Sequence, residues 1–182
     1  ARPQAEALAA LVADAEGRFR AAKRSARAAD FDDLLRLARD LLRRDGALRA
    51  ELRARFRAFL VDEYQDVNPL QQEIFDLLAG PGETPGPVMV AVGDAKQSIY
   101  RFRGADVGVF ARLLGRLEAG EGRVLALPQN HRSAPALVEL VNETFARALQ
   151  PPAGLPPRDD EIAFRERDRL LPTRPPGASP AC

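Results

Sequence analysis

Hydrophobic residues recur at helical spacing through the first third of the chain. Residues 3–28 are rich in alanine and place apolar positions between alternating acidic and basic ones, which predicts an amphipathic helix. A second helix is expected over residues 31–44, capped by Asp30 and ended by two arginines and a glycine. A third, from about residue 48 to residue 56, carries arginines that we interpret as a solvated face: Arg49, Arg53, Arg55 and Arg57.

Three short apolar runs have the pattern of buried strands, at residues 59–61, 88–92 and 124–127. Because the second run is continuously apolar, we expect its strand to be covered on both faces. Helices are expected at residues 69–78, 107–117 and 134–149. This alternation predicts an α/β fold, in which a parallel sheet has flanking helices and a helical N-terminal part. Residues 80–87 predict a surface loop, and the Pro-rich stretch 150–182 an irregular or disordered tail.

Each predicted strand is followed by a cluster of polar residues. The clusters are DEYQD at 62–66, GDAKQSIYRFRGAD at 93–106 and QNHRS at 129–133. Open α/β sheets bind ligands at the carboxyl ends of their strands, so we expect the three clusters to form one site. In a metal-nucleotide site of this kind, Asp62 would hold Mg²⁺ and Glu63 would accept a proton from the attacking water. The alternative for these two carboxylates is an ordinary solvated strand exit.

Composition narrows the class of protein. The chain has 182 residues, 46% of them hydrophobic, and can bury one core or one lobe plus part of another. The net charge of +1 gives no general basic field, so any contact with nucleic acid must be local. The single cysteine, Cys182, excludes an internal disulfide framework or a cysteine-based zinc site. Without an apolar run of membrane-spanning length or a leader, a cytoplasmic protein with no membrane partner is expected.

The three polar clusters closely resemble motifs II, III and IV of superfamily 1 DNA helicases of the UvrD/Rep type. The segment YRFRGAD within the middle cluster is most similar to the RecB and AddA helicase-nuclease branch. Residues 32–35, which follow Phe31, also resemble a helical segment that precedes motif II in that family. The resemblance covers about residues 20–149.

The resemblance implies a RecA-like P-loop NTPase motor that hydrolyses ATP with Mg²⁺ and moves 3′ to 5′ along single-stranded DNA during repair or recombination. It assigns Asp62 and Glu63 to the metal site and Glu63 to the role of catalytic base. The remaining nucleotide contacts implied are Gln65, Asp94, Gln97 and Arg132, with Gln65 and Gln97 as γ-phosphate sensors and Arg132 as arginine finger. The DNA contacts implied are Tyr100, Phe102 and Arg103. For the two aromatic residues the alternative is burial in the core.

The sequence also departs from the family. It contains no Gly-x-x-x-x-Gly-Lys-Ser/Thr loop, so we expect the chain alone to lack ATPase activity and to bind ATP weakly or not at all. Motifs expected after motif IV and a nuclease domain are also missing, and His131 stands where many relatives carry tyrosine.

We therefore expect a fragment of a longer helicase, whose partners would be DNA, the remainder of the chain and a nuclease subunit. Its parts would be residues 1–56 and 57–122 of the first lobe, 123–149 of the second lobe and the tail 150–182. Two alternatives are a complete, non-catalytic nucleotide- or DNA-binding domain and a nucleotide-binding fold whose partner is not DNA.

Overall fold

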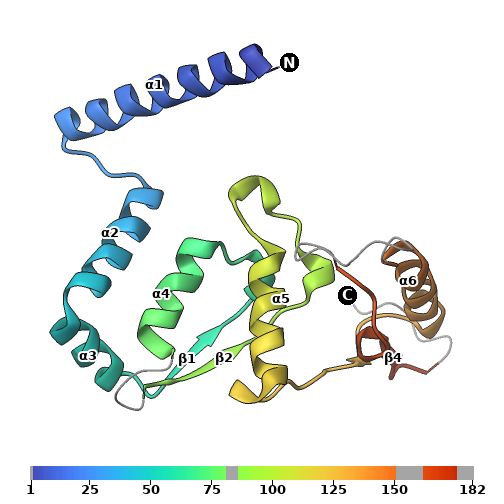
Figure 1. The fold of residues 1–182 in the computed structure, drawn as a ribbon. Coiled ribbons are helices and arrows are strands. Elements are labelled where there is room, and N and C mark those ends of the chain that lie inside the picture. The colour runs from blue at the N-terminus through green and yellow to red at the C-terminus, as the bar shows by residue number, and fades with distance from the viewer. Residues whose placement is uncertain (1, 81–85, 151–161, 176–182) are drawn as a thin grey trace. The chain divides into compact units, whose positions relative to one another are not determined.

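The chain combines helices with two small parallel sheets in a computed structural model that describes residues 2–80, 86–150 and 162–175 (Figure 1). It divides into two compact units. The first unit contains residues 1–56 and 73–86, and the second contains residues 57–72 and 87–182. The expected lobe boundaries stay predictions, because compact packing units do not test them.

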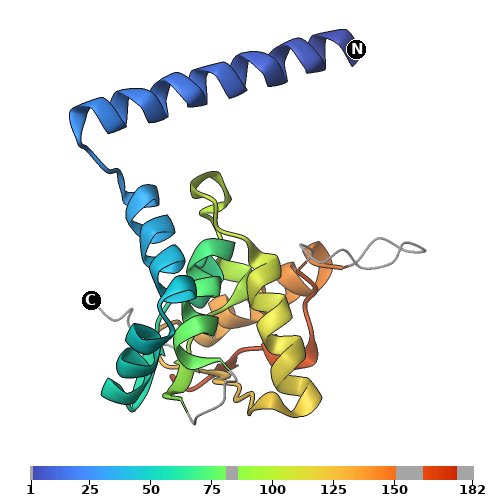
Figure 2. The same ribbon diagram turned by 60° about the vertical axis from the view of Figure 1, so that its left-hand side comes forward.

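Three helices dominate the first unit: α1 (Arg2–Ala26), α2 (Phe31–Arg44) and α3 (Gly46–Arg55). The expected cap of α2 is confirmed: Asp30 accepts a hydrogen bond from the backbone N–H of Asp33, whose carboxylate accepts one from the N–H of Asp30 in return. Asp45 separates α2 from α3 and caps α3, which begins two residues earlier than expected. Figure 2 shows the two helices following one another along the chain.

Arg53 corrects the interpretation of the arginine cluster as a solvated face. Its side chain is buried, and its guanidinium donates hydrogen bonds to the carbonyl oxygens of Leu77, Leu78 and Gly80. These carbonyls belong to the end of helix α4 (Pro69–Ala79), where backbone oxygens lack partners within the helix. The planar, five-donor guanidinium satisfies several of them at once.

Two parallel strands, β1 (Ala58–Val61) and β2 (Val88–Ala91), lie side by side in the second unit (Figure 1). Their register pairs Ala58 with Val88 and Val61 with Ala91. The expectation that β2 is covered on both faces is wrong for the described residues. Exposure alternates along both strands, and one face leaves Leu60 81% and Val88 64% exposed. The alternation follows from the two-residue period of a strand, since only one face is covered here.

A small core forms around helix α5 (Val107–Arg116). Val109, Phe110 and Leu113 are buried on one side of this helix, and the ring of Phe110 lies 6.0 Å from the buried ring of Tyr64. Tyr64 belongs to a short 3-10 turn that follows β1. The core therefore fixes the segment that directly follows Asp62 and Glu63.

The strand expected at residues 124–127 is absent; the segment has no ladder partner among the described residues. The residues that form a strand here are Gln129–Asn130 (β3), which pair in parallel with Leu171–Pro172 (β4). The expectation of an irregular tail is therefore wrong for residues 162–175, which contain β4 and a 3-10 turn. Residues 151–161 and 176–182 of that tail lie outside the described residues. Helix α6 (Pro135–Ala148) follows β3 and contacts β4.

No helix in the part of the chain that the structure describes is long and apolar enough to cross a membrane.

Candidate functional site

The carboxyl ends of β1 and β2 meet, as the sequence predicted. The backbone N–H of Val92 donates to the carbonyl of Val61 at 2.8 Å, and the N–H of Tyr64 donates back to the carbonyl of Val92 at 2.9 Å. These two bonds continue the ladder past the strand ends. They place the polar clusters that begin at Asp62 and Gly93 at one edge of the sheet.

Glu63 adopts a backbone conformation that non-glycine residues rarely use. Its φ and ψ are 51° and 44°, in the left-handed region, and its N–H donates to Asp62 Oδ1 at 2.9 Å. Such a conformation costs on the order of 1–3 kcal/mol and persists only where the surroundings impose it, often at functional sites. Both carboxylates are exposed at the strand exit, where a ligand can reach them.

Gln65 connects the two clusters. Its side chain is only 2% exposed, donates from Nε2 to Glu63 Oε2 at 2.5 Å and accepts at Oε1 from the backbone N–H of Asp94 at 3.0 Å. The backbone carbonyl of Gln65 also accepts a hydrogen bond from Ser98 Oγ at 3.2 Å. Both ends of the buried amide are therefore used, and Gln65 fixes Glu63 relative to the loop after β2.

The loop after β2 is held by its own charges. Asp94 accepts from Gln97 Nε2 at 3.1 Å and pairs with Lys96 Nζ at 2.7 Å. Burial alone would raise the pKa of the Asp94 carboxyl, but the hydrogen bonds from Lys96 and Gln97 outweigh it and hold that pKa below its ordinary value. Asp94 is therefore ionised at neutral pH and keeps the Gln97 side chain bound.

Gly93 leaves no room for a side chain where the two clusters meet. A Cβ at this position would lie 2.8 Å from Gln65 Oε1 and 3.2 Å from the backbone nitrogen of Tyr64. We therefore expect Gly93→Ala to lower the free energy of unfolding of the 182-residue chain by about 1–3 kcal/mol, measured by urea denaturation.

A matched control is Gly115→Ala, since a Cβ at Gly115 in α5 would have no heavy atom within 4 Å other than its chain neighbours and the backbone of its own helix. The free energy of unfolding of this control should rise by up to about 1 kcal/mol, because alanine has a higher helix propensity than glycine. Equal stability changes in the two variants would contradict the close contact at Gly93.

The chemistry of the two carboxylates fits a magnesium ion. Mg²⁺ in nucleotide sites binds through one or two carboxylates, keeps several waters and takes further oxygens from phosphate. Asp62 has one carboxylate oxygen bound to the Glu63 N–H, and Glu63 has one bound to Gln65, so neither of these bonds uses the second oxygen of the two carboxylates. Among the described residues, no group of three or more His, Cys, Asp and Glu side chains could hold a metal ion.

Tyr100, Phe102 and Arg103 form an exposed group on the same loop. Phe102 is 79% exposed and Tyr100 37%, with their ring centroids 6.0 Å apart. The Arg103 guanidinium lies 5.3 Å from the Tyr100 ring centroid and 5.7 Å from that of Phe102. The alternative that Phe102 is a core residue is therefore wrong in this structure. The group offers aromatic faces and a positive charge together.

Arg132 lies in the exposed turn between β3 and α6. Its backbone N–H and that of Ser133 donate to Asn130 Oδ1 at 3.1 and 2.8 Å. The third cluster belongs to a separate sheet, because β3 pairs with β4 and not with β1 or β2. The expectation that all three clusters form one site stays a prediction. In the described structure the first two clusters are joined directly, and the third is not.

Sequence reasoning missed two residues that contact these clusters, Asp168 and Thr173. Asp168 lies 3.5 Å from Lys96 Nζ, and Thr173 donates from Oγ1 to the carbonyl of Asn130 at 3.0 Å. The charged patch at residues 158–169 was the available signal for Asp168. No local pattern marks Thr173.

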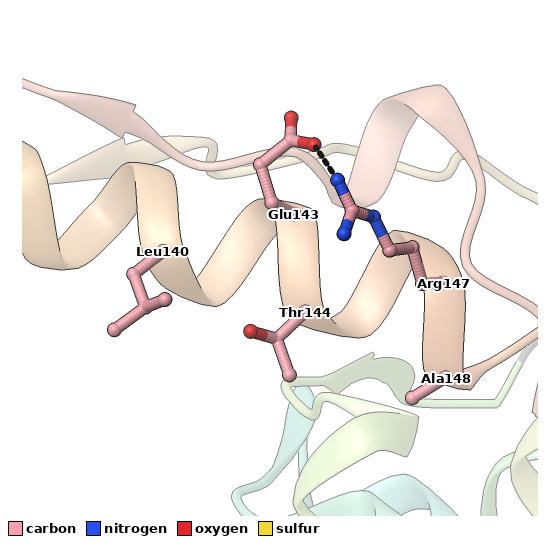
Figure 3. Close-up of a pocket in the computed structure, with 5 residues that line it drawn as sticks. All are labelled: Leu140, Glu143, Thr144, Arg147 and Ala148. Atoms are coloured by element: carbon pink, nitrogen blue, oxygen red, sulfur yellow. Dashed lines mark ion pairs between the residues drawn. The ribbon is translucent and has the colours of Figure 1, made fainter.

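Two hollows lie near helix α6. A small cavity of about 160 Å³ is lined by Asp94, Lys96 and Gln97 on one side and by α6 and residues 164–170 on the other. A larger, open hollow of about 580 Å³ runs along α6 itself (Figure 3). There Leu140, Thr144 and Ala148 point to one side, while Glu143 pairs with Arg147 at 3.7 Å on the other. It contains none of the predicted site residues, so the smaller cavity is the one beside the candidate site.

The comparisons identify the class of protein. Residues 2–117 match the family model described as UvrD/REP helicase N-terminal domain. The chain therefore belongs to the UvrD/REP helicase family.

Similar proteins are named as one subunit of an ATP-dependent helicase/nuclease. The protein of this name from Pelotomaculum thermopropionicum is 37% identical over 163 residues, which are 84% of this chain and 13% of that protein. The protein from Lactiplantibacillus plantarum is 42% identical over 144 residues, or 75% of this chain and 11% of the relative. The protein from Streptococcus pneumoniae strain D39 is 32% identical over 155 residues, or 84% of this chain and 12% of the relative. The chain thus spans only a small part of the length of these relatives.

Proposed function

We propose that the chain is part of the RecA-like motor core of an ATP-dependent DNA helicase, called the parent helicase below, and supplies several of its ATP-hydrolysing residues. The observation that carries this proposal is the buried Gln65, which joins the candidate base Glu63 to the loop of Gln97. A strand exit without a function needs no buried amide between two loops. Family membership and the similarity to helicase/nuclease proteins support the same conclusion.

The roles follow from the positions of the side chains. Asp62 and Glu63 would hold Mg²⁺ against the phosphates of ATP, and the ion would supply positive charge to the phosphate oxygens. The second carboxylate oxygen of Glu63 would accept the proton of the attacking water. Its other oxygen is occupied by Gln65, so the base is presented in one orientation.

Gln97 and Arg132 would act on the γ-phosphate. Gln97 is exposed at the loop after β2 and held through Asp94, so its amide is available to a ligand. Arg132 carries a fixed charge and a forked set of donors on a different part of the fold. We propose that it approaches the phosphate when the motor closes over ATP.

The phosphate-binding loop would come from the rest of the parent helicase. The relatives are about eight times longer than the segment they share with this chain, and the exposed face of β1 and β2 supports further packing there. The proposed partners are a nuclease subunit and DNA, with 3′ to 5′ movement along a single strand in repair or recombination.

The exposed aromatic group would be the contact to single-stranded DNA. Stacking of a base on an aromatic side chain is worth about 1–3 kcal/mol, so Phe102→Ala in the parent helicase should weaken single-strand binding by about that amount. Tyr100→Ala should have a smaller effect, because the Tyr100 ring is less exposed. Fluorescence anisotropy with a labelled oligonucleotide measures both.

The matched control is Ile99→Ala, which removes an exposed apolar side chain from the same loop without removing a ring. Its DNA affinity should stay at the parental value. If Phe102→Ala also keeps parental affinity and unwinding, the aromatic group is not the DNA contact.

A further inference from the structure

One short segment, residues 162–175, contacts both loops that carry the proposed phosphate sensors. At its first contact, Asp168 forms an ion pair with Lys96, at 3.5 Å between Oδ1 and Nζ. Lys96 in turn pairs with Asp94, which binds the amide of Gln97. An unbroken series of polar contacts therefore leads from the segment to Gln97.

The second contact is with the turn that carries Arg132. Thr173 donates to the carbonyl of Asn130 from both its N–H, at 3.1 Å, and its Oγ1, at 3.0 Å. Its Oγ1 also lies 2.8 Å from His131 Nδ1, within hydrogen-bond distance. Arg174 donates from Nη1 to the carbonyl of Arg132 at 2.9 Å. The segment therefore holds the backbone on both sides of His131.

Between its two contacts the segment is fixed to helix α6. Asn142, only 4% exposed, donates from Nδ2 to the carbonyl of Leu170 and accepts at Oδ1 from the N–H of Leu170, both at 2.9 Å. A buried amide with both ends satisfied is costly to displace. Leu170 lies two residues after Asp168 and three before Thr173, so the anchor limits independent movement of the two contacts.

We propose that residues 162–175 form a coupling segment that connects the Gln97 loop to the Arg132 turn and transmits movement between them. Asp168 and Thr173 are positioning residues: neither contacts nucleotide, and each acts through the loop that it binds. A displacement of either loop then moves the other, which links the two phosphate contacts. The consequence for ATP hydrolysis rests on the proposed function, whereas the mechanical link does not.

Hydrogen exchange in the 182-residue chain tests the link without any activity. Thr173→Val removes the hydroxyl beside Asn130, yet it should accelerate exchange of the amides at residues 97–98 by roughly tenfold. Conversely, Asp168→Asn should accelerate exchange at residues 132–133. Thr173→Ser and Asp168→Glu keep the bonding groups and should leave the distant loop at the parental rate. If each variant accelerates exchange only in the loop that it contacts, the proposed coupling role is wrong.

Steady-state kinetics of the parent helicase tests the consequence. Asp168→Asn and Thr173→Val should each lower kcat for DNA-stimulated ATP hydrolysis by about tenfold, because small displacements of aligned groups are costly, with little change in KM for ATP. The double variant should lose no more than the worse single variant, since both act on one connection. The control Glu166→Gln alters an exposed side chain of the same segment, 91% accessible, and should keep parental kcat.

The two hypotheses fail differently. Parental kcat in Asp168→Asn and Thr173→Val, in a protein that Glu63→Gln inactivates, would overturn the coupling role and leave the proposed function standing. Full activity in Glu63→Gln would overturn the proposed function, while the exchange experiment would still decide the mechanical link.

Discussion

Replacing Arg132 with alanine in the parent helicase should lower DNA-stimulated ATP hydrolysis by about 10³–10⁵-fold, the range measured for arginine fingers in other phosphoryl-transfer enzymes. The turn that carries Arg132 is exposed and held by hydrogen bonds to its backbone from Arg174 and to Asn130. Those bonds do not use the Arg132 side chain. The fold and DNA binding should therefore persist in the variant, as circular dichroism and anisotropy would show.

Arg132→Lys should lose most of the activity as well, because an ammonium group cannot reproduce the planar, forked donors of a guanidinium. The matched control is Arg147→Ala, which removes an exposed arginine from α6, where it pairs only loosely with Glu143 at 3.7 Å. Its ATPase rate should equal that of the parent. Near-parental rates in both Arg132 variants would assign this residue a structural role.

Glu63→Gln should lower hydrolysis by about 10²–10⁴-fold, the usual contribution of a general base, while ATP binding survives. A glutamine side chain keeps the shape of Glu63, and its carbonyl oxygen can still accept the hydrogen bond from Gln65 Nε2. The negative charge that accepts the proton is lost, while Asp62 still supplies a carboxylate to the proposed Mg²⁺ site. Steady-state ATPase assays and nucleotide-binding titrations of the same preparation separate the two effects.

The control for Glu63 is Glu139→Gln, which makes the same chemical change at an exposed position of α6. This variant should hydrolyse ATP at the parental rate. A Glu63→Gln protein as active as this control would remove Glu63 from the role of base.

The parts of the fold that the sequence predicts correctly are those set by local or nearest-neighbour rules. Asp30 caps α2 through a hydrogen bond to Asp33, a residue only three positions further along the chain. The meeting of Asp62 with Gly93 follows from parallel pairing of two consecutive strands, which brings their carboxyl ends to one edge. The exposure of Phe102 fits its interpretation as a ligand contact, although its role remains a prediction.

The parts that the sequence does not predict depend on distant partners. Residues 124–127 are as apolar as β1 but have no ladder partner among the described residues, whereas β3 pairs with β4 some forty residues later. Arg53 is charged, and only the carbonyls at the end of α4 make its burial favourable. Thr173 binds Asn130 across 43 residues. The periodicity of hydrophobic residues indicates which face of a helix or strand is buried, but it does not show which distant residues come into contact.

The role of Gln65 depends partly on a local sequence pattern and partly on contacts with distant residues. Its place in the DEYQD cluster is visible in the sequence, but its burial and its two bonds, to Glu63 and to the N–H of Asp94, are visible only in the fold. That geometry turns two separate motifs into one candidate site.

Single-turnover hydrolysis in the parent helicase tests the central claim most directly. Labelled ATP is mixed with an excess of enzyme and single-stranded DNA, and the fraction converted to ADP is followed for the parent and for Glu63→Gln. The account predicts that both proteins bind the nucleotide, that the parent converts it, and that Glu63→Gln retains it as ATP. Conversion at the parental rate by Glu63→Gln would contradict the assignment of this strand edge as the hydrolytic site.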